Sequence, residues 1–95
     1  LQKFTSLNKD YEKAVCLVNL GSVFISVNRY DSALLYSLQA EEAFRKLGYT
    51  RFQTVAIGNA GIAYGKLGQT KEGIYYLQQA IDLHQKNNNT KELSF

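Results

Sequence analysis

Residues that tolerate a left-handed backbone recur every twenty positions along this chain. They are Asn8, Asn28, Gly48, Gly68 and Asn88. Glycine and asparagine adopt the left-handed conformation more readily than other residues, and that conformation commonly ends an α-helix. The spacing predicts a helix to about residue 6, then helices over about 9–27, 30–47, 50–67 and 70–87, and a last one beginning near 90.

The apolar residues between these stops follow helical spacing. In the first full segment, Leu17, Leu20, Phe24 and Val27 recur every three or four residues, which places them along one helix face. Because only a few residues separate the helices, consecutive helices must run antiparallel. The sequence therefore predicts an all-α fold made of antiparallel helical hairpins.

A second period of forty residues pairs identical side chains. The pairs include Val15 with Val55, Asn19 with Asn59, Gly21 with Gly61, Tyr36 with Tyr76 and Ala40 with Ala80. We interpret residues 1–95 as a single domain of two full repeats, about 9–48 and 49–88, with partial repeats at both ends. Since both ends fall inside helical patterns and Met is absent, we expect a fragment of a larger protein.

The residues Asn19-Leu20-Gly21-x-x-Phe24, followed by Ala33 and Ala40, resemble the tetratricopeptide (TPR) repeat pattern. The second copy reads Asn59-Ala60-Gly61-x-x-Tyr64, followed by Gly73 and Ala80. The period is forty rather than the common 34, and the usual proline at the repeat end is missing. The long form is similar to repeats of bacterial regulatory and sensor proteins and of eukaryotic adaptors. The resemblance implies an α-solenoid in which the hairpins stack as a right-handed superhelix.

This resemblance assigns packing roles to the small and aromatic residues. Glycines at 21, 61 and 73 and alanines at 33, 40 and 80 are expected to allow close helix approach. Phe24 and Tyr64 are expected between hairpins. We interpret Gly58, Gly65 and Gly68 as further close-packing positions. The repeat does not explain the glycine at position 65, because the residue forty positions earlier is Ile25. Cys16 is expected to be a small buried residue.

The resemblance also implies a peptide-binding groove lined by the first helix of each hairpin. The residues predicted to line it are Val15, Asn19, Ser22, Ser26, Arg29, Val55, Asn59, Ile62 and Lys66. Asn19 and Asn59 share a register and could clamp a peptide backbone, because an amide both donates and accepts hydrogen bonds. Arg29 and Lys66 would favour an acidic partner or a terminal carboxylate. The alternative is that both asparagines only bond local polar groups.

One specific form of peptide binding is not expected. Chaperone-binding repeats place a lysine three residues before the glycine and an asparagine directly after it. Val18 and Ser22 occupy these positions in the first repeat, and Gly58 and Ile62 occupy them in the second. The resemblance therefore does not extend to that carboxylate clamp.

Composition favours a binding module over other classes of protein. The net charge of +3 comes from 11 Lys and Arg against 8 Asp and Glu in scattered clusters, so no nucleic-acid partner is expected. No apolar run approaches the ~18 residues of a membrane span. No catalytic triad, metal cluster or phosphate loop is present, so we expect neither an enzyme nor a cofactor. A cytoplasmic location is favoured. The alternative function is a structural spacer or self-association module.

Overall fold

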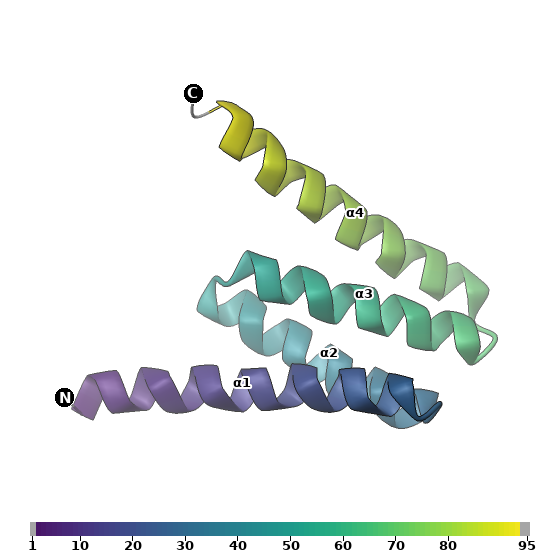
Figure 1. Ribbon diagram of the computed structural model, residues 1–95, viewed down its shortest axis with the longest axis horizontal. Helices are drawn as coiled ribbons and strands as arrows, with labels where there is room; N and C mark the ends of the chain where they lie inside the picture. The colour runs from purple at the N-terminus through teal and green to yellow at the C-terminus, as the bar shows by residue number, and fades with distance from the viewer. Residues whose placement is uncertain (1, 94–95) are drawn as a thin grey trace.

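The computed structural model describes the backbone of residues 2–93 and the side chains of residues 9–86. Four α-helices fill this range and no strand occurs within it: α1 (Gln2–Ser26), α2 (Tyr30–Leu47), α3 (Thr50–Lys66) and α4 (Thr70–Leu93). Successive helices reverse direction, so that α1 and α2 form one antiparallel hairpin and α3 and α4 form the next (Figure 1). The expected all-α architecture of helical hairpins is confirmed.

The three turns between the helices have the same hydrogen-bonding pattern. Asn28, Gly48 and Gly68 adopt φ values of 63°, 82° and 87°. In the first turn, the N–H of Asn28 donates to the carbonyl of Ile25 at 3.1 Å, and the N–H of Arg29 donates to that of Phe24 at 2.8 Å. The other two turns repeat both bonds at the positions twenty residues further on. These paired bonds form a Schellman motif, which satisfies carbonyls that the helix end would leave unpaired.

Two of the five predicted stops are not formed. Helix α1 passes through Asn8 without a break, and α4 passes through Asn88, so the separate helices expected before 6 and after 90 are wrong. Asparagine also adopts ordinary helical dihedrals at a cost below about 0.7 kcal/mol, so it permits a stop without requiring one. The three stops that form are those after which the next helix packs back on the one before it.

Small residues bring the two helices of each hairpin close together. A Cβ atom added at Gly21 would lie 2.6 Å from Oγ of Ser37, and one added at Gly61 would lie 2.8 Å from Cγ of Leu77. Ser37 and Leu77 are themselves forty residues apart, so the two hairpins repeat the same contact. A Cβ at Gly73 would meet backbone atoms of Gly61 and Gly65 at 3.0 Å. The close-packing role is therefore confirmed at Gly21, Gly61 and Gly73.

The same role is wrong for three other glycines, since a Cβ at Gly58, Gly65 or Gly68 would meet nothing within 4 Å. Gly68 instead supplies the left-handed turn conformation. The backbone of Gly65 lies against Gly73. This contact requires a glycine at position 73 but would allow a side chain at position 65.

Aromatic pairs join the helices within each hairpin. Phe24 stacks on Tyr36 with ring centroids 5.5 Å apart, and their counterparts forty residues later, Tyr64 and Tyr76, stack at 5.2 Å. We use "counterpart" below for residues that are forty positions apart. The expected placement of Phe24 and Tyr64 between hairpins is therefore corrected, because each ring pairs with the second helix of its own hairpin.

The main core lies where α1, α2 and α3 meet. Phe44 is completely buried there, among Ala14, Val18, Ala40 and Ala56. Its ring stacks on Phe52 at 5.1 Å and meets Tyr11 and Tyr49 edge-on. The three alanines of this cluster allow α1, α2 and α3 to approach closely around the Phe44 ring, which positions α1 beside α3.

The turns provide a test in which one substitution has opposite effects at two glycines. Gly48→Ala should lower the free energy of unfolding by about 1–2 kcal/mol, because alanine is strained in the left-handed conformation of Gly48. Gly58→Ala should raise it by roughly 0.5–1 kcal/mol, because Gly58 lies inside α3 and its Cβ would meet open space. Urea unfolding followed by circular dichroism measures both. Effects of the same sign would contradict the turn assignment.

Candidate peptide-binding surface

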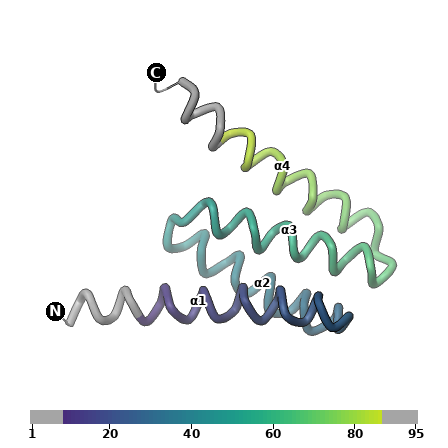
Figure 2. Tube along the Cα trace, in the orientation of Figure 1, coloured from purple at the N-terminus to yellow at the C-terminus, as the bar shows by residue number. Residues whose placement is uncertain are grey.

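Helices α1 and α3, the first helices of the two hairpins, contact each other directly. In Figure 2, α3 runs in roughly the same direction as α1, and α2 returns from behind the end of α1 to the start of α3. The nine residues predicted to line a groove belong to these two helices and to the turn after α1. We call them the α1–α3 surface: Val15, Asn19, Ser22, Ser26, Arg29, Val55, Asn59, Ile62 and Lys66.

A hydrogen bond joins the two repeats across this surface. Nδ2 of Asn59 on α3 donates to Oγ of Ser22 on α1 at 3.1 Å. Asn59 is part-buried, whereas Asn19 and Ser22 are exposed. Asn59 therefore bonds a local polar group, as the alternative interpretation expected. Its Oδ1 atom can still accept a hydrogen bond from a ligand. The exposed side chain of Asn19 lies one helical turn from Ser22 on α1.

The rest of the α1–α3 surface is mainly exposed. Val55 and Ile62 on α3 are 47% and 40% exposed. Arg29 and Lys66 are exposed, and neither forms an ion pair with a residue in the described range. Val15 differs from the others, because it is part-buried and packs against the core cluster. The surface thus offers two amides, two aliphatic side chains and two cationic groups.

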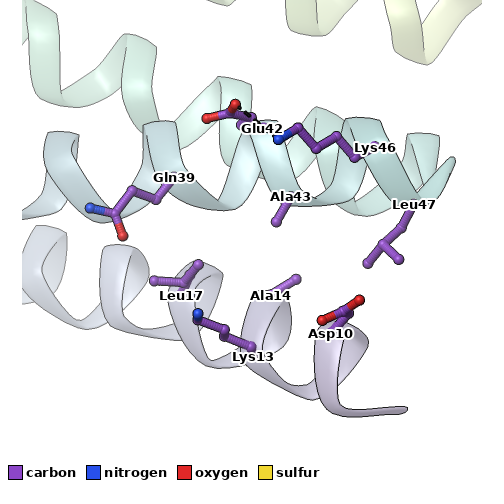
Figure 3. A pocket seen from close by; sticks show the side chains of 9 residues that line it. All are labelled: Asp10, Lys13, Ala14, Leu17, Gln39, Glu42, Ala43, Lys46 and Leu47. Atoms are coloured by element: carbon purple, nitrogen blue, oxygen red, sulfur yellow. Dashed lines mark ion pairs between the residues drawn. The ribbon is translucent and has the colours of Figure 1, made fainter. Parts of the chain in front are cut away.

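A hollow of about 530 Å³ lies on the first hairpin, between α1 and α2, and was not predicted from the sequence. Ala14 and Leu17 of α1 point toward Ala43 and Leu47 of α2 across it (Figure 3). Charged residues of both signs surround this apolar floor, including Asp10 and Lys13 on α1. On α2, Nζ of Lys46 pairs with Oε2 of Glu42 at 3.4 Å. We call this the first hollow.

The second hollow, of about 340 Å³, lies where α2, α3 and α4 meet. There Oε2 of Glu41 on α2 accepts a hydrogen bond from Nε2 of Gln53 on α3 at 3.0 Å. Tyr75 and Tyr76 line the α4 side. Burial raises the pKa of the Tyr76 hydroxyl, and nearby Tyr64, Glu41 and Tyr75 raise it further. Tyr76 therefore remains a neutral phenol at physiological pH and can act as a hydrogen-bond donor.

Cys16 does not have the environment expected of it, because it is exposed on α1. Its counterpart Ala56 is completely buried under α2. The periodicity places both residues correctly on the helix, but burial depends on whether another helix covers that face.

Comparisons of the chain with protein-family models, curated proteins and solved structures give no match. Among the described residues, no group of three or more metal-binding side chains comes together. Within the same range, no helix has the length and apolar character required to cross a membrane.

Proposed function

We propose that this chain is a non-catalytic TPR-like module that binds a protein or peptide as the sensor or scaffold part of a larger signalling protein. The observation that carries the proposal is the contact between α1 and α3, where Asn59 donates a hydrogen bond to Ser22, which lies one helical turn from Asn19. The repeated turns and the close approaches at Gly21 and Gly61 support TPR-like hairpins, and we infer that these hairpins stack into a right-handed superhelix.

The chemistry of the α1–α3 surface defines the expected ligand. The free carbonyl oxygen of Asn59 and the amide of Asn19 suit the backbone groups of an extended peptide. Val55 and Ile62 provide apolar contact for its side chains, while Arg29 and Lys66 favour acidic side chains or a terminal carboxylate. We therefore expect an extended acidic peptide with at least one aliphatic or aromatic residue.

Selection from a random peptide display library on the 95-residue chain tests this proposal. Peptides enriched for acidic residues should bind the native chain and lose at least tenfold in affinity in the Asn19→Ala, Asn59→Ala double variant, because about 1.4 kcal/mol of hydrogen bonding is removed. Fluorescence anisotropy with a selected peptide measures the affinity.

Two control variants separate ligand contact from folding. Gln78→Ala changes an amide on α4, away from the α1–α3 surface, and should leave the affinity unchanged. Ser22→Ala removes the acceptor that Asn59 uses within the chain, so it reports how much the bridge between repeats contributes to stability. Selected peptides that bind the double variant as tightly as the native chain would contradict the proposal.

A further inference from the structure

The second hollow is enclosed by three successive helices of the array. Helices α2 and α4 both pack on α3, while their own backbones do not approach each other within the described residues. The space between them has a volume of about 340 Å³, at the small end of the usual range of ligand pockets, about 300–1,000 Å³. A ligand in this space could therefore contact both hairpins.

The stacking of a further hairpin would leave this hollow open. The two hairpins of the chain meet partly through Glu41 of α2, which bonds Gln53 of α3. The counterparts of Glu41 and Arg45 on α4 are Ile81 and Gln85, and neither of them lines the hollow. A hairpin that stacked on α4 as α3 stacks on α2 would therefore cover a different face of α4.

The hollow contains a partly buried carboxylate with one oxygen available. The side chain of Glu41 is 19% exposed, and its Oε2 atom accepts hydrogen bonds from Nε of Arg45 at 3.2 Å and from Nε2 of Gln53 at 3.0 Å. Both donors use the same oxygen, so Oε1 has no donor in the described part of the chain. Because the side chain of Arg45 is 57% exposed, water screens its charge more than that of Glu41, which leaves the interior of the hollow negative.

The remaining lining suits the stem of a cationic side chain. Ile57 is 4% exposed and Leu83 is part-buried, and both provide apolar surface. Tyr75 is 60% exposed, and its ring stands edge-on to that of Tyr76 with the ring centroids 5.6 Å apart. The face of an aromatic ring attracts a cation. Lysine buries its methylene stem along apolar surface while its ammonium stays among polar groups.

We propose that the second hollow binds a lysine side chain of a partner protein, with its ammonium at Oε1 of Glu41 and its methylene stem against Ile57 and Leu83. A lysine fits better than an arginine, because one available carboxylate oxygen matches a compact ammonium, whereas a guanidinium bonds best to both oxygens at once. Gln79 is exposed at the hollow and can bond the partner's backbone beside the lysine. None of the lining residues belongs to the α1–α3 surface, so the inference does not depend on binding of an acidic peptide there.

The first hollow provides a comparison within the same chain. Its acidic residues, Asp10 and Glu42, are both exposed, and Oε2 of Glu42 pairs with Nζ of Lys46 at 3.4 Å. No aromatic side chain lines it (Figure 3). The first hollow therefore has neither a partly buried carboxylate nor a ring for a cation, and Glu42 is a matched control for Glu41.

An NMR titration of the 95-residue chain with Nα-acetyl-lysine N-methylamide, in which the ammonium is the only charge, tests the proposal. Signals of the Gln53 side-chain amide and of the backbone amides of Ile57 and Gln79 should shift, with the roughly millimolar affinity expected for so small a ligand. The norleucine and glutamate analogues should each bind at least about fivefold more weakly, because the first lacks the charge and the second reverses it.

Three results of this titration would overturn the proposal. The first is the absence of shifts at about 100 mM of the lysine compound, well above the expected dissociation constant. The second is binding of the norleucine or the glutamate analogue as tightly as the lysine compound. The third is equal affinity for n-butylamine, which lacks the backbone amides that Gln79 can bond, because the hollow would then recognise a free amine instead of a protein side chain.

Two substitutions in the ion pair should change the affinity for the lysine compound in opposite directions. Glu41→Gln removes the charge but keeps an oxygen for Gln53, so it should weaken binding about fivefold with helical circular dichroism retained. Arg45→Gln removes the cation that competes for Glu41 and should strengthen binding about twofold. Glu42→Gln makes the same change of charge at the first hollow and should leave the affinity unchanged. Weaker binding to Arg45→Gln, or equal binding to Glu41→Gln and the native chain, would contradict a cationic ligand.

Discussion

Replacing Phe44 with alanine should lower the free energy of unfolding by about 3–5 kcal/mol. Phe44 is the largest completely buried side chain in the described range, and it lies among small residues of α1, α2 and α3. Its removal leaves a cavity lined in part by Ala14, Ala40 and Ala56, which cannot extend to fill the space. Since a chain of this size has roughly 5–15 kcal/mol of stability, much of the population should unfold at elevated temperature.

Thermal and urea unfolding of the native chain and of the Phe44→Ala variant measure the difference in their free energies of unfolding. Phe44→Leu is the matched control, because leucine keeps much of the volume and should cost less than the full truncation. We expect α1, α2 and α3 to lose protection from hydrogen exchange together in Phe44→Ala, because all three contact the ring or its immediate neighbours. A loss confined to α2 would show that Phe44 does not join the three helices energetically.

The turns of this fold were predictable from the sequence because they depend on local backbone chemistry. Asn28, Gly48 and Gly68 take the left-handed conformation at the predicted positions. The same chemistry could not distinguish them from Asn8 and Asn88, since asparagine fits both a turn and a continuous helix. Whether the chain reverses is decided by what the following helix can pack against.

Burial and surface shape were less predictable for a related reason. The repeat gives Cys16 and Ala56 equivalent positions, but only Ala56 is covered by another helix. The first hollow likewise depends on how α1 and α2 pack against each other, which no single motif encodes. By contrast, the bond from Asn59 to Ser22 agrees with the alternative expectation that the asparagines bond local polar groups, although the sequence did not identify Ser22 as the partner.

The spacing of glycines along α3 likewise did not predict which of them contact another helix. Gly58, Gly61 and Gly65 recur along α3 with similar spacing, yet only Gly61 has a neighbour where its Cβ would be. The decisive contacts come from α4, whose Gly73 lies against the backbone of α3. Spacing on one helix predicts which residues share a face, while the partner helix determines which of them must be small.

Replacing Gly73 with leucine should detach α4 from α3 while leaving the first three helices folded. A Cβ at this position meets the carbonyl oxygen of Gly61 and the amide nitrogen of Gly65 at 3.0 Å, and backbone atoms cannot rotate away as a flexible side chain can. A leucine there should cost about 1–3 kcal/mol in overpacking, reduced by up to about 1 kcal/mol because a helical glycine is removed.

The consequence should be local because α4 packs closely against α3 alone, whereas α3 is also held by α1 and α2. Hydrogen exchange should therefore show lost protection within residues 70–86, with the core around Phe44 retained. Gly58→Leu, which places the same side chain on the part of α3 where a Cβ meets nothing within 4 Å, is the matched control and should leave α4 protected. Equal loss of protection in all four helices would mean that the two hairpins unfold as one cooperative unit, and would contradict an array held together by contacts between neighbouring helices.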